Sequence, residues 1–321
     1  MDYSDFDINA ETVEDIWDRI TDEELSAAAE EKADTMDIPV PLPKADGGKA
    51  PKVVCYNTRV EATPSGASEY KGLVREVGKE IRVLSGALRR MFIFDIETRL
   101  ASTSGRYVLK KDLTHTSVRV FDKKIVRDKL DDLAVFLLVD MSGSMRGTKI
   151  DVAKRTAIVL AESFASLKIP CYIMGFTADE DWNAGTVNQY HFVSWKNTPA
   201  ERASLSGIAH KWDNDDGYSI RYAAQVLKRK PAEHKILFVI SDGSPACMRY
   251  DHVNGIEDTT HAILEAKKIA EVFGIGIGSG VYPELKEMYG GNYLMVRNVQ
   301  DLTENFSRQM KTIVNGFKRK M

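Results

Sequence analysis

Two apolar runs of strand length, each ending in an aspartate, constrain the fold of this chain more than any other feature. The first run, LAVFLLVD, extends from Leu133 to Asp140 and passes directly into the small-residue turn MSGSM. The second run, KILFVISDG, ends with Asp242 and Gly243. Val- and Leu-rich runs without alternation are typical of parallel strands that are covered on both faces. We therefore expect an α/β fold with a doubly wound, mostly parallel sheet, preceded by a helical N-terminal region.

The chain after residue 131 alternates between helix and strand patterns, which is the signature of βαβ units. The expected helices cover residues 150–167, 200–210, 220–230, 257–270 and 302–317. The other expected strands are PCYIMGFT (170–177), an edge strand YHFVSW (190–195), EVFGIGIG (271–278) and YLMVRNV (293–299).

Three regions are expected along the chain. Residues 1–50 form an acidic arm and linker, expected to be partly disordered, with a short amphipathic helix within 11–33. Residues 51–130 contain one long helix at 67–91 and connecting segments; the apolar stripe of this helix is Leu73, Val77, Ile81, Leu84, Leu88 and Met91. Residues 131–321 form the α/β domain.

The charge is distributed unevenly between the arm and the rest of the chain. Residues 1–50 carry fifteen acidic and four basic residues, a net charge of −11, whereas the remainder carries 32 acidic and 40 basic residues, a net charge of +8. This division favours an arm that contacts a protein partner or folds back on the body, and it does not favour nucleic-acid binding. A merely solvated tail fits the same pattern.

The sequence also limits the compartment and the redox chemistry. No apolar run approaches the length of a membrane span, and the acidic N-terminus is unlike a signal peptide, so we expect a cytoplasmic protein with no membrane partner. Cys55, Cys171 and Cys247 are odd in number and widely spaced, which implies neither a disulfide framework nor a zinc ribbon.

Side chains suited to a hard cation stand at the end of the first apolar run. Asp140, Ser142 and Ser144 alternate along a tight turn, and carboxylate and hydroxyl oxygens suit Mg²⁺. Helix capping by Ser144 or Thr148 explains the same turn equally well. The second aspartate changes this balance, because Asp140 and Asp242 at neighbouring strand ends would repel each other without a cation between them.

These motifs resemble the metal-ion-dependent adhesion site of von Willebrand factor A (VWA) domains. In that resemblance Asp140, Ser142 and Ser144 match the first segment of the site, and Asp242 matches the last. The middle segment is Asp216-Gly217-Tyr218-Ser219, in which Tyr218 stands where the family has a threonine. The resemblance implies a site for Mg²⁺ or Mn²⁺, with Tyr218, Ser219 or Asp216 as the ligand from the middle segment.

A narrower resemblance is to the branch that contains the CobT subunit of cobaltochelatase and NorD. The segments that carry it are LSGALRRMF (84–92), DMSGSMRG (140–147), GFT (175–177), DGYSIRYA (216–223) and KILFVISDGSP (235–245). It implies an adaptor that works with an AAA+ ATPase of the MoxR or CobS kind to remodel or metallate a client protein. The alternatives are a structural VWA domain with a degenerate metal site, and a subunit of a cobalt or magnesium chelatase complex.

The sequence offers little support for catalysis by the chain alone. It contains no Walker motif, no nucleophile elbow and no acid–base pair beyond the aspartates of the metal site. The six histidines are scattered without ligand spacing. We therefore assign no catalytic residue and no organic cofactor, and expect at most a non-catalytic subunit of a chelatase-like complex.

Overall fold

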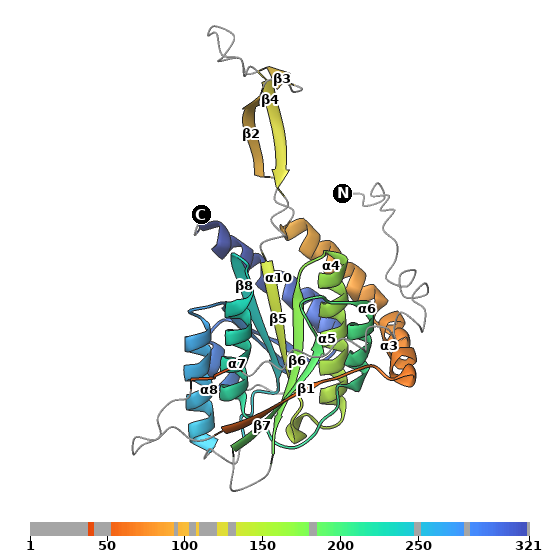
Figure 1. Cartoon of the computed structure of the whole chain (residues 1–321), viewed down its shortest axis with the longest axis vertical. Coiled ribbons are helices and arrows are strands. Elements are labelled where there is room, and N and C mark those ends of the chain that lie inside the picture. The colour runs from red at the N-terminus through yellow and green to blue at the C-terminus, as the bar shows by residue number, and fades with distance from the viewer. Residues whose placement is uncertain are drawn as a thin grey trace.

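The computed structural model describes residues 38–41, 53–92, 96–102, 107–108, 121–127, 133–179, 185–246, 252–278 and 283–319. These residues form a seven-stranded sheet with helices on both faces and a separate three-stranded sheet (Figure 1). The helix predicted within 11–33 and most of the predicted acidic arm lie outside the described residues.

The large sheet has the expected doubly wound, mostly parallel form. Its strands are β1 (Val53–Arg59), β5 (Leu133–Asp140), β6 (Cys171–Ala178), β7 (Gly185–Val193), β8 (His234–Ser241), β9 (Glu271–Ile277) and β10 (Tyr293–Val296). Their order across the sheet is β1-β7-β6-β5-β8-β9-β10. All neighbouring pairs are parallel except β6 and β7. The chain leaves β5 for β6 on one side and later enters β8 on the other, so the strand order reverses beside the end of β5.

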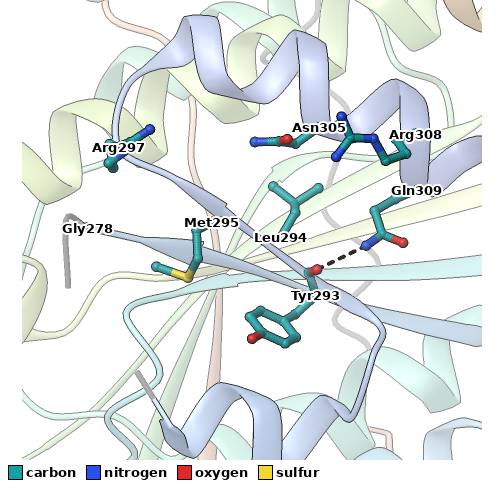
Figure 2. A pocket seen from close by; sticks show the side chains of 8 residues that line it. All are labelled: Gly278, Tyr293, Leu294, Met295, Arg297, Asn305, Arg308 and Gln309. Atoms are coloured by element: carbon teal, nitrogen blue, oxygen red, sulfur yellow. Dashed lines mark hydrogen bonds between the residues drawn. The ribbon is translucent and has the colours of Figure 1, made fainter. Parts of the chain in front are cut away.

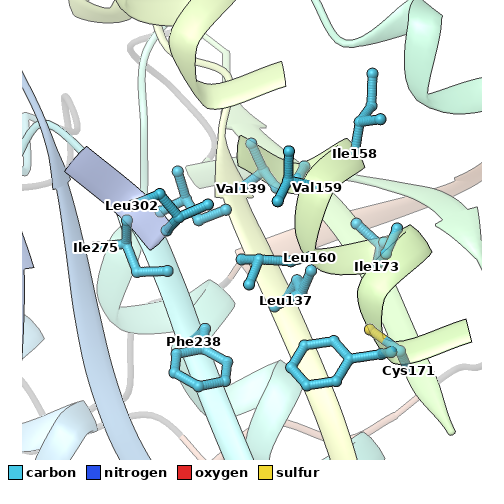
Figure 3. Close-up of a cluster of buried hydrophobic side chains, with 14 of the residues drawn as sticks. Leu137, Val139, Ile158, Val159, Leu160, Cys171, Ile173, Phe238, Ile275 and Leu302 are labelled. Atoms are coloured by element: carbon cyan, nitrogen blue, oxygen red, sulfur yellow. The ribbon is translucent and has the colours of Figure 1, made fainter. Parts of the chain in front are cut away.

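The two faces of β5 belong to two different apolar clusters. All eight residues of β5 are buried, and alternate side chains point to opposite faces of the sheet. One face packs against α4 (Gly78–Phe92), α5 (Thr148–Ser166) and α10 (Val299–Arg319). Figure 3 shows this cluster, in which Leu137 and Val139 of β5 lie beside Leu160 and Leu302. The other face packs against α7 (Asp216–Arg229), α8 (His252–Ala266) and α9 (Pro283–Tyr289).

The helix predicted at 67–91 is two helices, α3 (Pro64–Glu76) and α4. The first begins at the Thr63 cap, whose side chain accepts a hydrogen bond from Gly66 N, with Pro64 in the first turn. The interruption falls at Val77, immediately before Gly78, a residue that weakens helices by about 1 kcal/mol relative to alanine. The apolar stripe continues across the interruption, so both helices pack on the same cluster.

The strand predicted at an edge of the sheet is not an edge strand. Residues 190–193 belong to β7, and β1 pairs along its outer side from Val53↔Gly185 to Arg59↔His191. Residues 53–92 therefore share a sheet and a core with the predicted domain that begins at residue 131. The sequence of β1, VVCYNTR, is short and ends in polar residues, so it gives only a weak strand signal.

The remaining elements are short or lie apart from the main sheet. Between β7 and α7 the chain forms α6 (Pro199–Ala203) and the 3₁₀ turn η4 (Ser204–Gly207), where one helix over 200–210 was predicted. The strands β2 (Ile96–Ser102), β4 (Phe121–Arg127) and β3 (Tyr107–Val108) form the second sheet, which Figure 1 shows extending from the body at the end where β5 begins. No helix among the described residues has the length and apolarity that crossing a bilayer requires.

Candidate metal centre

Two buried aspartates stand at the carboxyl ends of the neighbouring strands β5 and β8. Asp140 and Asp242 are both almost completely inaccessible to solvent. Asp140 Oδ1 accepts a hydrogen bond from Ser142 N at 2.8 Å, and its Oδ2 accepts one from Ser241 Oγ at 2.9 Å. These contacts orient the carboxylate of Asp140 at the point where the strand order reverses.

The charge on this pair is only partly compensated. Burial raises the pKa of Asp140 to about 6, and the negative charge of Asp242 adds to the rise, whereas hydrogen bonds from Ser142 and Ser241 oppose it. A raised carboxyl pKa means that the surroundings disfavour the anionic form. Added positive charge near Asp140 would therefore favour its anionic form, and the predicted cation between Asp140 and Asp242 stays a prediction.

The hydroxyls of the first motif lie together at the rim. Ser142 Oγ and Ser144 Oγ are 2.9 Å apart and share a hydrogen bond. Ser142 is buried and Ser144 is exposed, so one hydroxyl of the pair lies inside the protein and the other lies at its surface. The turn contains the short 3₁₀ helix η3 (Gly143–Met145), and neither serine caps α5, whose N-cap is Gly147 without a side-chain bond. Capping, the alternative explanation of this motif, is therefore not what Ser144 provides.

A third aspartate from the middle segment faces the same cluster. Asp216 is the first residue of α7 and is buried, and its Oδ2 has no hydrogen-bond partner among the described residues. Burial, followed by the charges of Asp140, Asp215 and Asp242, raises its pKa well above the ordinary value. A buried carboxylate oxygen without a donor is costly, and a cation in contact with it would remove that cost.

The other two residues proposed for the middle segment are engaged elsewhere. Tyr218 is buried in the apolar cluster of α7 and α8, and its backbone N donates to Asp215 Oδ1 at 3.0 Å. Ser219 is fully buried, and its Oγ accepts a hydrogen bond from Gln189 Nε2 at 3.0 Å. Of the three proposed residues, Asp216 is the one whose pKa is raised by the charges of Asp140 and Asp242.

Close packing between α7 and α8 holds Asp216 in place. A Cβ on Gly217 would lie within 2.0 Å of Asp258 Oδ2, so only glycine fits at this position. Both carboxylate oxygens of Asp258 accept hydrogen bonds from Arg221, at 2.8 and 3.1 Å. This bidentate pair joins the N-terminal half of α7 to α8.

Three residues that the sequence did not single out complete the centre. Asn214 Nδ2 donates to Ser244 O at 3.1 Å and to Asp140 Oδ2 at 3.4 Å, and its Oδ1 accepts from Ala246 N at 2.8 Å. Ser241 orients Asp140, as described above. Lys149 Nζ donates to Asp242 Oδ2 at 2.7 Å. The sequence signal around Asn214 is the polar run DNDDG, which ends in the Asp216-Gly217 of the middle segment.

The loop before Asn214 is joined to the serine turn by backbone hydrogen bonds. Gly143 N donates to Trp212 O, and Lys211 N donates to Met141 O at 2.6 Å. A Cβ on Gly143 would lie 3.1 Å from Trp212 O, so glycine permits this approach. Trp212 itself is 60% exposed, so the residue whose backbone carbonyl contacts the serine turn presents a large aromatic side chain to solvent.

The donor set fits a hard divalent cation bound partly through hydroxyls and water. No three carboxylate, imidazole or thiolate side chains of the described residues are arranged to hold an ion by themselves. The predicted set does not require such a group, because it combines Asp140 and Asp242 with serine hydroxyls, and Mg²⁺ commonly keeps several waters.

A pocket lies away from these aspartates. It has a volume of about 470 Å³ and lies between β10 and α10, lined by Tyr293, Arg297, Arg308 and their neighbours (Figure 2). Gln309 Nε2 donates to Tyr293 O at 3.1 Å within it, and Arg297 pairs with Asp301 at 3.0 Å. It contains no strand-end carboxylate, so it is not the predicted site.

Comparison with known proteins identifies relatives over the same residues. A sequence model described as "Cobalamin biosynthesis protein CobT VWA domain" matches residues 120–215 and 196–316. The chain is 30% identical over 220 residues to the uncharacterized protein YojO of Bacillus subtilis, covering 64% of this chain and 34% of YojO. It is 30% identical over 188 residues to protein NorD of Brucella suis, covering 55% of this chain and 29% of NorD. The chain thus spans about a third of the length of these relatives.

A solved structure gives a more distant match. The von Willebrand factor type A protein from Catenulispora acidiphila superposes with a TM-score of 0.43 at 16% identity. The superposition covers 56% of this chain and 42% of that chain.

Proposed function

Since this chain belongs to the CobT VWA-domain family and is a VWA protein of the CobT and NorD type, we propose that it is a metal-dependent protein-binding adaptor. The observation that carries the proposal is that Asp140, Asp216 and Asp242 are all buried, that the charges of Asp140 and Asp242 raise the pKa of Asp216, and that Asp216 Oδ2 has no hydrogen-bond partner among the described residues. An excess of buried negative charge beside an exposed hydroxyl supports cation binding at the rim.

Each residue of the cluster would have a distinct role in binding Mg²⁺ or Mn²⁺. Asp140, Ser142 and Ser144 would form the first ligand set, Asp242 would bind directly or through water, and Asp216 would act on the ion through a water in place of the family threonine. A divalent cation held in this way supplies positive charge and water-filled positions that an incoming carboxylate can occupy. Ser144 is exposed, so an acidic side chain of another protein can reach this rim.

Titration calorimetry of the purified full-length protein with Mn²⁺ and Mg²⁺ tests the metal site. Wild type should bind one equivalent, and Asp140→Ala should abolish binding while the protein keeps its circular dichroism spectrum. The fold should survive because the substitution removes one of several mutually repelling buried carboxylates. Asp301→Ala is a matched control, since it removes an aspartate from a surface ion pair. Unchanged titration of Asp140→Ala would refute the assignment.

We further propose that the partner is an AAA+ ATPase of the MoxR or CobS kind, which the chain couples to a client protein. The resemblance to the CobT and NorD branch supports this proposal. A metal-bridged contact should be lost on adding EDTA and in Ser142→Ala, whereas a contact made by the −11 acidic arm should weaken with salt and survive the chelator. Pull-down of the ATPase by full-length protein under the two conditions distinguishes these contacts.

The alternative is a structural VWA domain with a degenerate metal site. The observation that favours it is the ion pair between Lys149 and Asp242, which places a protein cation on one of the carboxylates. If wild type shows no heat of Mn²⁺ binding and no EDTA sensitivity, the adaptor proposal fails and the structural role stands.

A further inference from the structure

Lys149, at the start of α5, forms an ion pair with one aspartate of the candidate metal centre. Its Nζ lies 2.7 Å from Asp242 Oδ2, on the carboxylate that faces Asp140. The side chain of Asp242 is 2% exposed and that of Lys149 is 30% exposed. The ammonium therefore reaches from the rim onto an otherwise buried carboxylate.

The backbone around Lys149 brings it to this position. Gly147 precedes the helix with φ of 79°, a conformation that side chains other than glycine rarely adopt. From this turn α5 begins at Thr148, and Lys149 in its first turn contacts a carboxylate 93 positions later in the chain.

The pair has the properties of a replaceable counter-charge. An isolated buried carboxylate beside a second one is strongly disfavoured, and Lys149 supplies a positive charge where the cluster has an excess of negative charge. A lysine has a long flexible stem and a strongly hydrated head, so its ammonium can move into water from a partly exposed position. Asp242 Oδ1, in contrast, is held by Ser244 N at 3.2 Å and stays in place.

We propose that the Lys149 ammonium and a divalent cation compete for Asp242, so that Lys149 sets the metal affinity of the centre and compensates its charge when metal is absent. This inference rests on the proposed metal site and adds the residue that regulates it. Metal binding then depends on displacement of the Lys149 ammonium, because this charge already occupies Asp242 in the metal-free protein.

Calorimetric titration of full-length protein with Mn²⁺ at constant ionic strength tests the competition. Lys149→Met keeps an unbranched side chain one atom shorter and removes its charge, and it should tighten Mn²⁺ binding about fivefold or more. Lys149→Arg keeps the charge and should bind within about twofold of wild type. Lys154→Met is the matched control on the same helix, because Lys154 pairs with Glu69 at 3.5 Å, away from the centre.

Thermal unfolding in EDTA provides a second readout. Lys149→Met should unfold at a temperature about 2–6 °C below wild type, because Asp242 loses its counter-charge, and excess Mn²⁺ should reverse the loss. For Lys154→Met, excess Mn²⁺ should change the unfolding temperature by the same amount as it does for wild type.

The outcomes separate this inference from the proposed function. If wild type binds Mn²⁺ and Lys149→Met binds equally or more weakly, the competition is refuted and the metal site stands. If neither protein binds Mn²⁺, both proposals fail. Tighter binding by Lys149→Met, with wild-type affinity in Lys149→Arg, supports the competition.

Discussion

Asp140 and Asp242 could be predicted from the sequence because a short-range pattern determines their position. A buried parallel strand must end at one edge of the sheet, so the residue that follows its apolar run lies at that edge. Asn214, Ser241 and Lys149 could not be predicted in the same way. Their contacts with the aspartates span 74, 101 and 93 residues, and loop geometry decides them.

Tyr218 shows how a family comparison and local packing can lead to different expectations. The sequence places its side chain at a ligand position, whereas the structure places it in the apolar cluster of α7 and α8. Tyr218→Thr should therefore lower the free energy of unfolding by about 2–4 kcal/mol, because the lost ring leaves a cavity. Urea denaturation measures this loss, and Tyr218→Phe is the control that keeps the ring. A Tyr218→Thr protein as stable as wild type would show that the ring is not packed.

At the scale of elements, the alternation of strands and helices after residue 131 was predictable because each element is continuous and strongly periodic. The interruption at Val77 was not, since the apolar stripe continues across it. The position of β7 inside the sheet was also hidden, because the strand that covers it lies some 130 residues earlier in the chain.

One buried ionic network joins three helices behind the sheet. Glu162 of α5 accepts hydrogen bonds from Arg202 Nε of α6 and from Tyr70 Oη of α3, both at 2.7 Å. Because the pair is almost fully buried, Glu162→Ala should cost about 3–5 kcal/mol of stability by leaving Arg202 uncompensated.

Denaturant unfolding of matched variants tests this network. The double variant Glu162→Ala/Arg202→Leu should lose less stability than the sum of its single changes. Glu76→Ala breaks an exposed pair between the same two helices, α3 and α5, and should cost less than about 1 kcal/mol. Equal losses for Glu162→Ala and Glu76→Ala would contradict the assignment.

The contacts of β7 with its neighbours should depend on pH through His191. Its ring accepts or donates hydrogen bonds with Tyr172 Oη at 2.8 Å on β6 and Asn57 Oδ1 at 3.0 Å on β1. Burial lowers the pKa of His191 to about 4. The unfolded chain takes up this proton below about pH 6.5, and the folded protein takes it up only near pH 4, so stability falls as the pH drops through this window.

The size of the His191 effect follows from this window. Between pH 7 and pH 4.5, wild type should lose about 2–3 kcal/mol more than His191→Gln, which has no titrating ring. Urea denaturation of both proteins at the two pH values measures the difference. Parallel losses in the two proteins would show that His191 titrates normally in the folded state.

At the scale of the whole molecule, the family match and the folded body have different boundaries. The matched region begins at residue 120, whereas the sheet and core include β1, α3 and α4 from residues 53–92. A protein cut at residue 120 would expose the outer edge of β7 and the apolar surface that α4 covers. Unpaired strand edges of this kind recruit other chains.

We therefore expect the protein truncated to 120–321 to elute as large oligomers in size-exclusion chromatography. A protein truncated to 38–321 keeps every described residue and should elute without such oligomers, like the full-length chain. Monodisperse behaviour of 120–321 at the concentration of the full-length control would show that β1 is dispensable.

During synthesis, β1 must remain unpaired until β7 has been made, because the two strands are far apart in the sequence. Val53 pairs with Gly185, so 132 residues must be synthesised after Val53 before its partner exists. At about 5–20 residues per second, that delay is between about 7 and about 26 s. Until β5, α5 and β6 have been synthesised, the apolar sides of α3 and α4 lack the sheet and helix that cover them in the folded protein. We therefore expect the nascent chain to bind holding chaperones before these strands appear, and slowed translation of residues 93–185 should lengthen that binding.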